Sequence, residues 1–235
     1  MKKLVCSLGA LLGLLLPLQA AQSVDYAHIE IYVAPFYHSQ GPRVKVGRFS
    51  DGLAGKEAEV LATLSEMRKD WDRLAFPELY VAAIRLYDLG YRKEAVYWFY
   101  TAQYRGRQFG ALLDKSQVGG LGSAGVELLE AQNAFVQLLA PYINGFGFGD
   151  IDSLLQTVEK VRREAEKLPD LEATYPGVTF KRKSEWNIVN ADLADSMKKF
   201  ITVVQSSKAD IQLQRSAQGM GKEFSKLKNK ELPRP

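Results

Sequence analysis

Most of the chain shows a helical pattern of hydrophobic and polar positions. From residue 56 onward, apolar residues recur three and four positions apart, which places them on one face of a helix. Pro77 and Gly90 fall where a helix commonly begins and ends, because proline fits the first turn and glycine tolerates the backbone conformation after the last. The segments predicted to be helical are 56–70, 77–89, 92–114, 126–140, 153–167 and 191–214. The pattern therefore predicts a mainly α protein.

A different pattern precedes these segments. Ile29, Ile31 and Val33 alternate with polar or aromatic residues, and a second alternating run extends from Arg43 to Phe49. A period of two is typical of a strand, and the sequence HSQGP between the runs is typical of a turn. We therefore expect a small N-terminal β-hairpin over about residues 27–49.

The two segments around Gly90 form a predicted helical hairpin over about 77–114. Small residues recur where its helices would cross, and aromatic residues fill the positions between them. The order of small residue, large residue, turn glycine, Ala, aromatic and Ala is met by Ala83, Leu86, Gly90, Ala95, Phe99 and Ala102. This stretch resembles the tetratricopeptide repeat and its Sel1-like relatives, and KEAVYWFYTAQYRG resembles the Sel1-like ending.

The resemblance covers roughly 30 residues, about one repeat of this class. One repeat cannot bury both of its faces alone, so neighbouring helical hairpins are required. The segments 56–70, 126–140 and 153–167 would be degenerate neighbours. The resemblance thus implies a short array of antiparallel helical hairpins.

In this family the first helix of a repeat usually lines a concave, ligand-facing surface. Carried over by register, that helix supplies four candidates, and two arginines that end the hairpin add a charged contact, because Tyr and Arg are favoured at interfaces. The candidate partner-binding residues are Tyr80, Ile84, Tyr87, Asp88, Arg105 and Arg107. The alternative for each tyrosine is a partly buried packing role.

The first 21 residues have the organisation of a secretory signal peptide. Two lysines precede an apolar run from Leu4 to Leu18, and small residues follow at Ala20 and Ala21. A membrane span needs roughly 20 apolar residues, and this run is shorter. We therefore expect cleavage of residues 1–21, and the short MKKL start favours a bacterial protein of the periplasm or cell exterior.

Composition excludes several classes of site and partner. Cys6 is the only cysteine and lies in the expected signal peptide, so the mature chain lacks disulfides and thiolate chemistry. Loss of Lys2 and Lys3 lowers the net charge from +4 to about +2, too little to indicate nucleic acid or a membrane surface. No later segment is apolar enough to span a bilayer. We expect one mainly helical domain over 22–218 and a flexible basic tail over 219–235.

Motifs for catalysis are scarce. The two histidines, His28 and His38, lack partners at metal-ligand spacing, and the chain has no HExxH, GxSxG or Walker sequence. We therefore expect no metal or cofactor. Carboxylates from separate helices could still meet as a hydrolase-type acid pair, because such pairs come from distant positions in sequence.

The sequence favours an exported, non-catalytic protein-binding module. Two roles fit this description: an immunity protein that neutralises a periplasm-acting toxin, and an adaptor for an envelope assembly. The alternatives are an envelope hydrolase with acids from separate helices, and a small-ligand or lipid carrier whose aromatic residues line a cavity. A deep pocket with converging acids would favour the hydrolase, whereas an open aromatic groove would favour binding.

Overall fold

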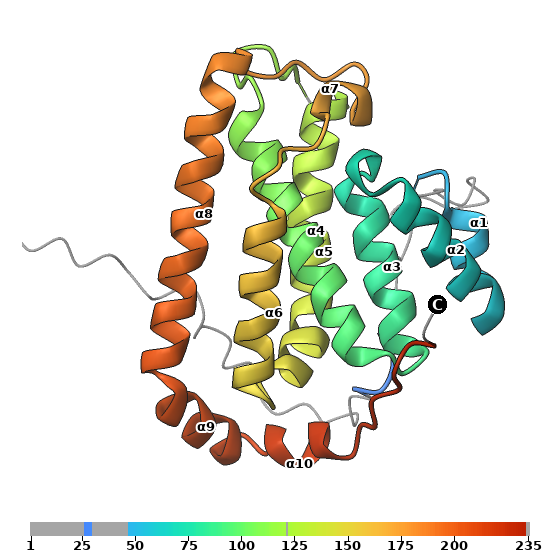
Figure 1. Ribbon diagram of the computed structural model, residues 1–235, viewed down its shortest axis with the longest axis vertical. Helices are drawn as coiled ribbons and strands as arrows, with labels where there is room; N and C mark the ends of the chain where they lie inside the picture. The colour runs from blue at the N-terminus through green and yellow to red at the C-terminus, as the bar shows by residue number, and fades with distance from the viewer. Residues whose placement is uncertain (1–25, 30–46, 121, 234–235) are drawn as a thin grey trace, which may run out of the picture.

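The computed structural model describes residues 26–29, 47–120 and 122–233, and these residues confirm a mainly helical protein. Long helices lie side by side along the molecule, while α9 and α10 run across one end of them (Figure 1). The helices are α1 (Ser50–Leu53), α2 (Glu57–Lys69), η2 (Trp71–Arg73), α3 (Phe76–Asp88), α4 (Arg92–Leu112), α5 (Ala124–Gly147), α6 (Ile151–Glu164), α7 (Leu171–Thr174), α8 (Lys183–Ser206), α9 (Lys208–Ala217) and α10 (Met220–Ser225).

The central pair is the helical hairpin of α3 and α4. Gly90 ends α3 with a φ of +93°, and the Tyr91 N–H donates to the Leu86 carbonyl at 2.8 Å, which closes the helix end as in a Schellman motif. Ala83, Ala95 and other small residues at the crossing are fully buried, so the two backbones approach closely. The packed hairpin predicted over 77–114 is confirmed, with α3 and α4 as its two helices.

Helix α5 covers the hairpin on the side that a repeat array would leave open. The ring of Tyr80 in α3 stacks on that of Phe135 in α5. Tyr87, two turns further along α3, meets the edges of Tyr142 and Phe146. These contacts place the predicted concave face of α3 inside the protein.

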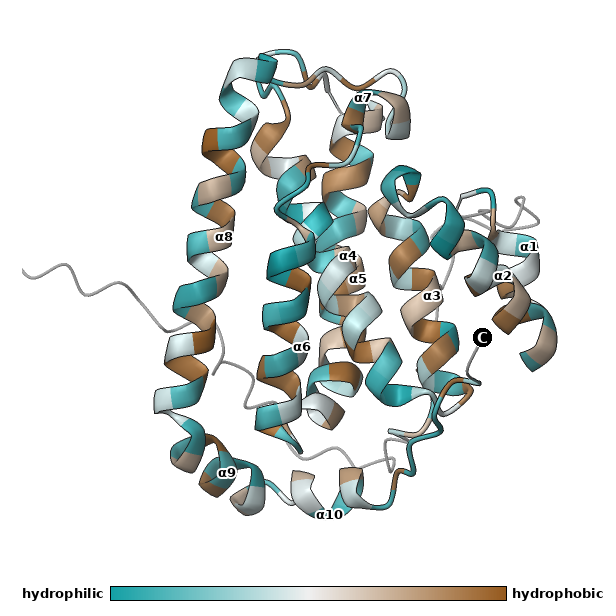
Figure 2. Cartoon of the chain, in the orientation of Figure 1, coloured by the Kyte–Doolittle hydropathy of each residue, from teal (hydrophilic) through white to brown (hydrophobic). Residues whose placement is uncertain are grey.

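Helices α6 and α8 complete the bundle on the other side of α4. Leu154, Val158 and Val161 form the buried face of α6, whose remaining positions are largely polar (Figure 2). A buried amide pair links α4 to α8, because Gln108 Nε2 donates to Asn190 Oδ1 at 2.7 Å. The helices are therefore joined by apolar packing and by a directional polar contact.

The N-terminal β-hairpin expected over 27–49 is not supported. Most of it, residues 30–46, lies outside the described residues, as does the expected signal peptide. The described ends of the segment contain no strand, since residues 26–29 form a turn and a bend and residues 47–49 lead into α1. Within the described ranges, the only β-type pairing is an isolated bridge between Leu113 and Phe180.

Helix α5 extends further than its sequence predicts. The sequence pattern ends it before Pro141, yet it continues to Gly147 with Pro141 inside it. Pro141 is exposed, while Ile143 in the following turn is fully buried. Burial of that turn offsets the hydrogen bond that proline cannot make. The extension carries Phe146 and Gly147 to the end of the bundle where α9 and α10 lie.

The expected flexible tail is packed against the bundle over its described part. Phe224 of α10 is only 4% exposed, and the Lys230 N–H donates to the Gly90 carbonyl at 2.8 Å. Arg92 at the start of α4 donates to the Lys228 carbonyl and, at 3.1 Å, to that of Ala27. One arginine therefore holds segments from both ends of the described chain, whereas the sequence predicts a flexible tail over 219–235.

Candidate functional site

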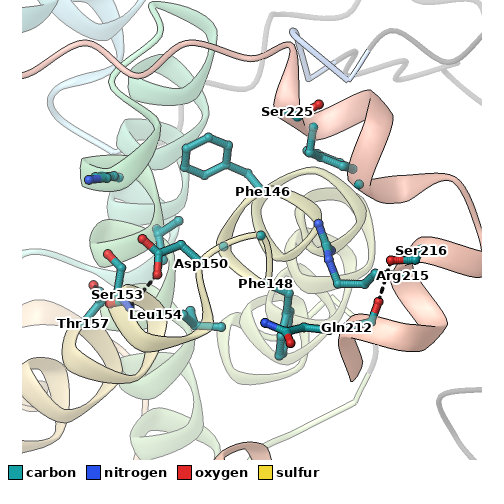
Figure 3. Close-up of a pocket in the computed structure, with 16 residues that line it drawn as sticks. Phe146, Phe148, Asp150, Ser153, Leu154, Thr157, Gln212, Arg215, Ser216 and Ser225 are labelled. Atoms are coloured by element: carbon teal, nitrogen blue, oxygen red, sulfur yellow. Dashed lines mark hydrogen bonds between the residues drawn. The ribbon is translucent and has the colours of Figure 1, made fainter. Parts of the chain in front are cut away.

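A cavity of about 450 Å³ lies between the α5–α6 turn and the helices α9 and α10 (Figure 3). Its volume falls within the range of small-molecule sites, roughly 300–1,000 Å³. Much of its lining is apolar, and the lining residues come from α4, α5, α6, α9, α10 and the α5–α6 turn. The apolar side chains are Val96, Phe146, Phe148, Leu154 and Phe224.

Glycines and a helix cap shape this cavity. Gly145 lies under the ring of Phe224, where a Cβ atom would come within 2.1 Å of the ring. Asp150 caps α6, because its carboxylate accepts the Ser153 N–H at 3.1 Å. The sequence NGFGFGD thus ends α5, turns the chain and starts α6 within a few residues, and it leaves aromatic side chains on the cavity wall.

Arg215 is the main cationic group of the cavity. Its side chain extends from α9 towards the α5–α6 turn (Figure 3), and Nη2 lies 3.6 Å from the position that a Cβ on Gly149 would occupy. The guanidinium carbon is 5.9 Å from the ring centroid of Phe224. Burial lowers the pKa of Arg215, and no acid in the described part of the chain forms an ion pair with it. The cavity therefore contains a partly desolvated cation that forms no ion pair with an acid of the described residues.

The charged groups of the described lining, Lys93, Arg215 and Asp150, leave the cavity with a net positive charge. Lys93 of α4 lines the cavity, and its ammonium has no acid partner among the described residues. Asp150 is the only acid in the described lining, and it is engaged as the helix cap. The N-terminus of α6, which carries partial positive charge, lies at the same place. The electrostatic environment thus favours a bound anion.

Polar hydroxyls of the cavity are used within their own helices. Ser216 Oγ donates to the Gln212 carbonyl and Ser225 Oγ donates to the Lys222 carbonyl, each at 3.0 Å. Neither serine faces a histidine or a second acid in the described lining. The geometry is suited to recognition of a ligand.

The sequence-predicted partner-binding residues lie elsewhere. Tyr80, Ile84 and Tyr87 are buried, since α5 covers their face of α3. Tyr87 Oη donates to the Tyr26 carbonyl at 2.8 Å, and the partly buried Asp88 accepts the Ile29 N–H at 2.9 Å. Hence Tyr87 and Asp88 do contact another segment, but that segment is the described N-terminal part of the same chain, residues 26–29.

The two predicted arginines have opposite environments. Arg105 is buried, and its Nη1 donates to the carbonyls of Trp71 at 2.7 Å and Leu74 at 3.1 Å. Burial lowers the pKa of Arg105. Arg107 is the only one of the six candidates that is exposed. The structure therefore does not bring the six residues together on one surface.

Sequence reasoning missed the residues that form the cavity. Arg215 and Phe224 lie at and beyond the end of the last helix that the sequence predicts, and Phe146 and Phe148 lie in a predicted loop. The alternation of Gly and Phe at 145–149 is the available signal, because glycines between aromatic residues allow close packing. No local pattern marks Arg215.

No helix in the described ranges is long and apolar enough to cross a bilayer. Within those same ranges, no three His, Cys, Asp or Glu side chains form a group that could hold a metal ion. Comparison with known proteins found no matching family model, no significantly similar curated protein and no significantly similar solved structure.

Proposed function

We propose that this protein is a non-catalytic binding protein whose ligand is a small amphipathic anion. The ligand class combines one carboxylate, sulfonate or phosphate group with an apolar body. Arg215 is partly buried in an aromatic-walled cavity and forms no ion pair with a described acid, and this observation carries the proposal.

Two physical effects support this ligand class. A cation that is partly removed from water is stabilised by an anion that hydrogen-bonds to it, and a guanidinium can bind such a group with two parallel N–H donors. Removal of an apolar body from water against Phe146, Phe148 and Leu154 contributes roughly 25 cal/mol per Å² of buried apolar surface. A ligand that has both parts benefits from both effects.

Export and the repeat scaffold remain part of the proposal. The expected signal peptide would place the cavity in the periplasm or outside the cell, and the α3–α4 hairpin is proposed to be a degenerate tetratricopeptide or Sel1-like unit. The immunity and adaptor roles need an accessible face on α3 for a partner protein. Tyr80, Ile84 and Tyr87 of that face are buried, so these residues are not available to a partner. The hydrolase role needs converging acids, whereas Asp150 is the only acid in the described lining of this cavity. Small-ligand binding therefore comes first.

A matched pair of fluorescent probes tests the proposal. The anion 8-anilinonaphthalene-1-sulfonate and the neutral N-phenyl-1-naphthylamine share an aromatic body and differ in the sulfonate. We expect the mature chain to bind both, and Arg215→Gln to weaken binding of the anionic probe about tenfold, or 1.4 kcal/mol. The same change should leave binding of the neutral probe within about twofold.

The exposed Arg107 supplies the control for loss of positive charge. Arg107→Gln should bind both probes as the parent does, and circular dichroism establishes that the variants are folded. Equal affinity of parent and Arg215→Gln for the sulfonate probe would remove Arg215 from the site and with it the proposal.

A further inference from the structure

A second depression of the surface has a different chemistry. It is an open groove of about 760 Å³ between the end of α2, the helices α4 and α6, and the C-terminal segment. The groove shares no lining residue with the cavity at Arg215 among the described residues. Its lining residues are Arg68, Trp71, Glu94, Tyr97, Lys160, Glu164, Leu232 and Pro233.

Trp71 and Tyr97 form an aromatic shelf in this groove. Their ring planes are 4° from parallel, their centroids are 5.9 Å apart, and both side chains are partly exposed. Most other aromatic residues of α3 and α4 are buried. The two rings are stacked on each other with a lateral offset, so that each leaves part of its apolar surface exposed in the groove.

Buried side chains pack against the ring of Trp71 and hold it in place. The fully buried Trp98 meets Trp71 edge to face at 5.1 Å, and the Arg105 guanidinium carbon lies 5.1 Å from the ring centroid of Trp71. Arg105 also binds the Trp71 carbonyl. Because these contacts fix the ring before any ligand arrives, binding loses little side-chain entropy.

Charges along the groove are balanced within the protein. Glu94 pairs with Arg68, and Glu164 lies 3.9 Å from Lys160. Glu164 also accepts a hydrogen bond from Tyr97 Oη at 2.6 Å. Neither an anionic nor a cationic ligand finds an uncompensated counter-charge in the described lining, so the groove is suited to a neutral ligand with several polar groups.

The face of Tyr97 attracts positive partial charge. Lys160 Nζ lies 4.2 Å from the ring centroid, as expected from the negative quadrupole of an aromatic face. The Lys160 side chain is largely exposed, and a ligand on this face would displace its ammonium from the ring. The weakly positive C–H groups on the face of a sugar ring are attracted by the same quadrupole.

A small polar cavity of about 40 Å³ adjoins the shelf and shares Trp71 and Glu164 with the groove. Gln108 lines it and is only 1% exposed. Its Nε2 donates to Asn190, but its Oε1 has no hydrogen-bond partner in the described part of the protein. An unpaired buried acceptor is unfavourable, and the volume admits a water molecule or one substituent that carries an O–H or N–H donor.

We propose that the groove binds a neutral saccharide. One sugar ring lies on the exposed part of Tyr97 beside Trp71, Glu94 and Glu164 accept hydroxyl hydrogen bonds, and a hydroxyl or acetamido N–H reaches Gln108 Oε1. A polyhydroxylated ring matches the aromatic face, the carboxylates and the buried acceptor together, which a purely apolar or a charged ligand does not.

Titration of the mature chain with tetra-N-acetylchitotetraose and with cellotetraose tests this proposal. Both are neutral, and the first supplies acetamido N–H donors. We expect calorimetric heat at millimolar ligand, with a change in tryptophan fluorescence from Trp71. Tyr97→Ala should weaken binding about tenfold, whereas Tyr97→Phe, which keeps the ring, should retain most of the affinity.

Further variants distinguish the contribution of Gln108 Oε1 from that of the aromatic rings. They also distinguish binding in the groove from binding in the cavity at Arg215. Gln108→Leu should weaken binding of the acetamido saccharide and preserve the fluorescence change. Arg215→Gln should bind both saccharides as the parent does. Adenosine, which is neutral and aromatic, serves as a competitor. Absence of binding to either saccharide at millimolar concentration, equal binding by folded Tyr97→Ala, or binding of adenosine alone would overturn the proposal.

Discussion

The ring of Tyr80 lies nearly flat against that of Phe135, with centroids 5.0 Å apart and planes 13° apart. This contact joins α3 to α5 across the face that the repeat resemblance assigns to a partner. Burial raises the pKa of Tyr80 well above its ordinary value of 10.0, since ionisation inside the protein would leave a poorly solvated charge. Tyr80 therefore serves packing of the bundle.

Loss of this stack should destabilise the fold. Phe135→Ala removes the ring and leaves a cavity above Tyr80, so we expect a loss of about 2–4 kcal/mol in the free energy of unfolding, near the lower end for a phenylalanine because Phe135 is partly exposed. Urea denaturation followed by circular dichroism measures the change. Gln137→Ala, at an exposed position of the same helix, should change stability by less than about 0.5 kcal/mol. Equal stabilities of the two variants would contradict this account.

Arg105 and Arg107 should differ sharply in their effect on stability. Arg105→Ala leaves two carbonyls of the α2–α3 connection without their donor and removes support from Trp71, so we expect a loss of about 2–3 kcal/mol. Arg107→Ala should change the free energy of unfolding by less than about 0.5 kcal/mol, because its side chain is exposed. Thermal and urea unfolding of both variants provide the comparison. An Arg105→Ala variant as stable as the parent would show that the hydrogen bonds of the buried Arg105 contribute little to stability.

Gly145 and Gly221 form a matched pair of helical glycines. Alanine at Gly145 would meet the ring of Phe224 at 2.1 Å, so Gly145→Ala should displace α10 even though alanine favours the helix by about 1 kcal/mol. A methyl group on Gly221 would have no described neighbour within 4 Å, and Gly221→Ala should be neutral or stabilising. Limited proteolysis reports the release of α10. Unchanged protection of Gly145→Ala would mean that Phe224 moves within the packed segment.

Glu159 should make stability depend on pH in the acid range. Hydrogen bonds from Arg162, supported by Arg163, lower the pKa of Glu159 from its ordinary 4.5 to about 2. A carboxylate with a lowered pKa stabilises the folded state above its ordinary pKa, and this contribution is lost as the pH falls to its folded value. The stability difference between the parent and Glu159→Gln should therefore be constant above about pH 5 and shrink between about pH 4.5 and 2.

Urea titrations at successive pH values measure that difference. Gln137→Ala is the control, because Gln137 is exposed and its replacement removes no titratable group. Its difference from the parent should stay flat over the same range. A shrinking difference in the control, or a flat one for Glu159→Gln, would refute the assignment.

Local rules are enough to predict most helices. Pro77 and Gly90 mark the start and end of α3 through backbone preferences that do not depend on distant contacts. The same rules predict the wrong end of α5. Exposed Pro141 stays in the helix because the turn after it, which contains Ile143, is buried against the rest of the bundle.

The described part of the C-terminal segment packs against the bundle, whereas its sequence predicts a flexible tail. Its lysines and weak periodicity are typical of a solvated end. Phe224 is nevertheless buried because Gly145, far away in sequence, leaves room for its ring. A single apolar residue in a polar segment has no periodic pattern. The residue that it packs against therefore cannot be predicted from the sequence and is known only from the packed helices.

The sequence by itself determined the helical class, the α3–α4 hairpin and the small residues at its crossing, because these depend on neighbours three or four positions apart. Tertiary structure decided which faces remain accessible. Arg105 and Arg107 lie two positions apart on one helix, yet packing against the α2–α3 connection buries the first and leaves the second in solvent. The cavity at Arg215 and the shelf of Trp71 and Tyr97 likewise combine residues from separate helices, whose meeting depends on the docking of whole elements and not on local periodicity.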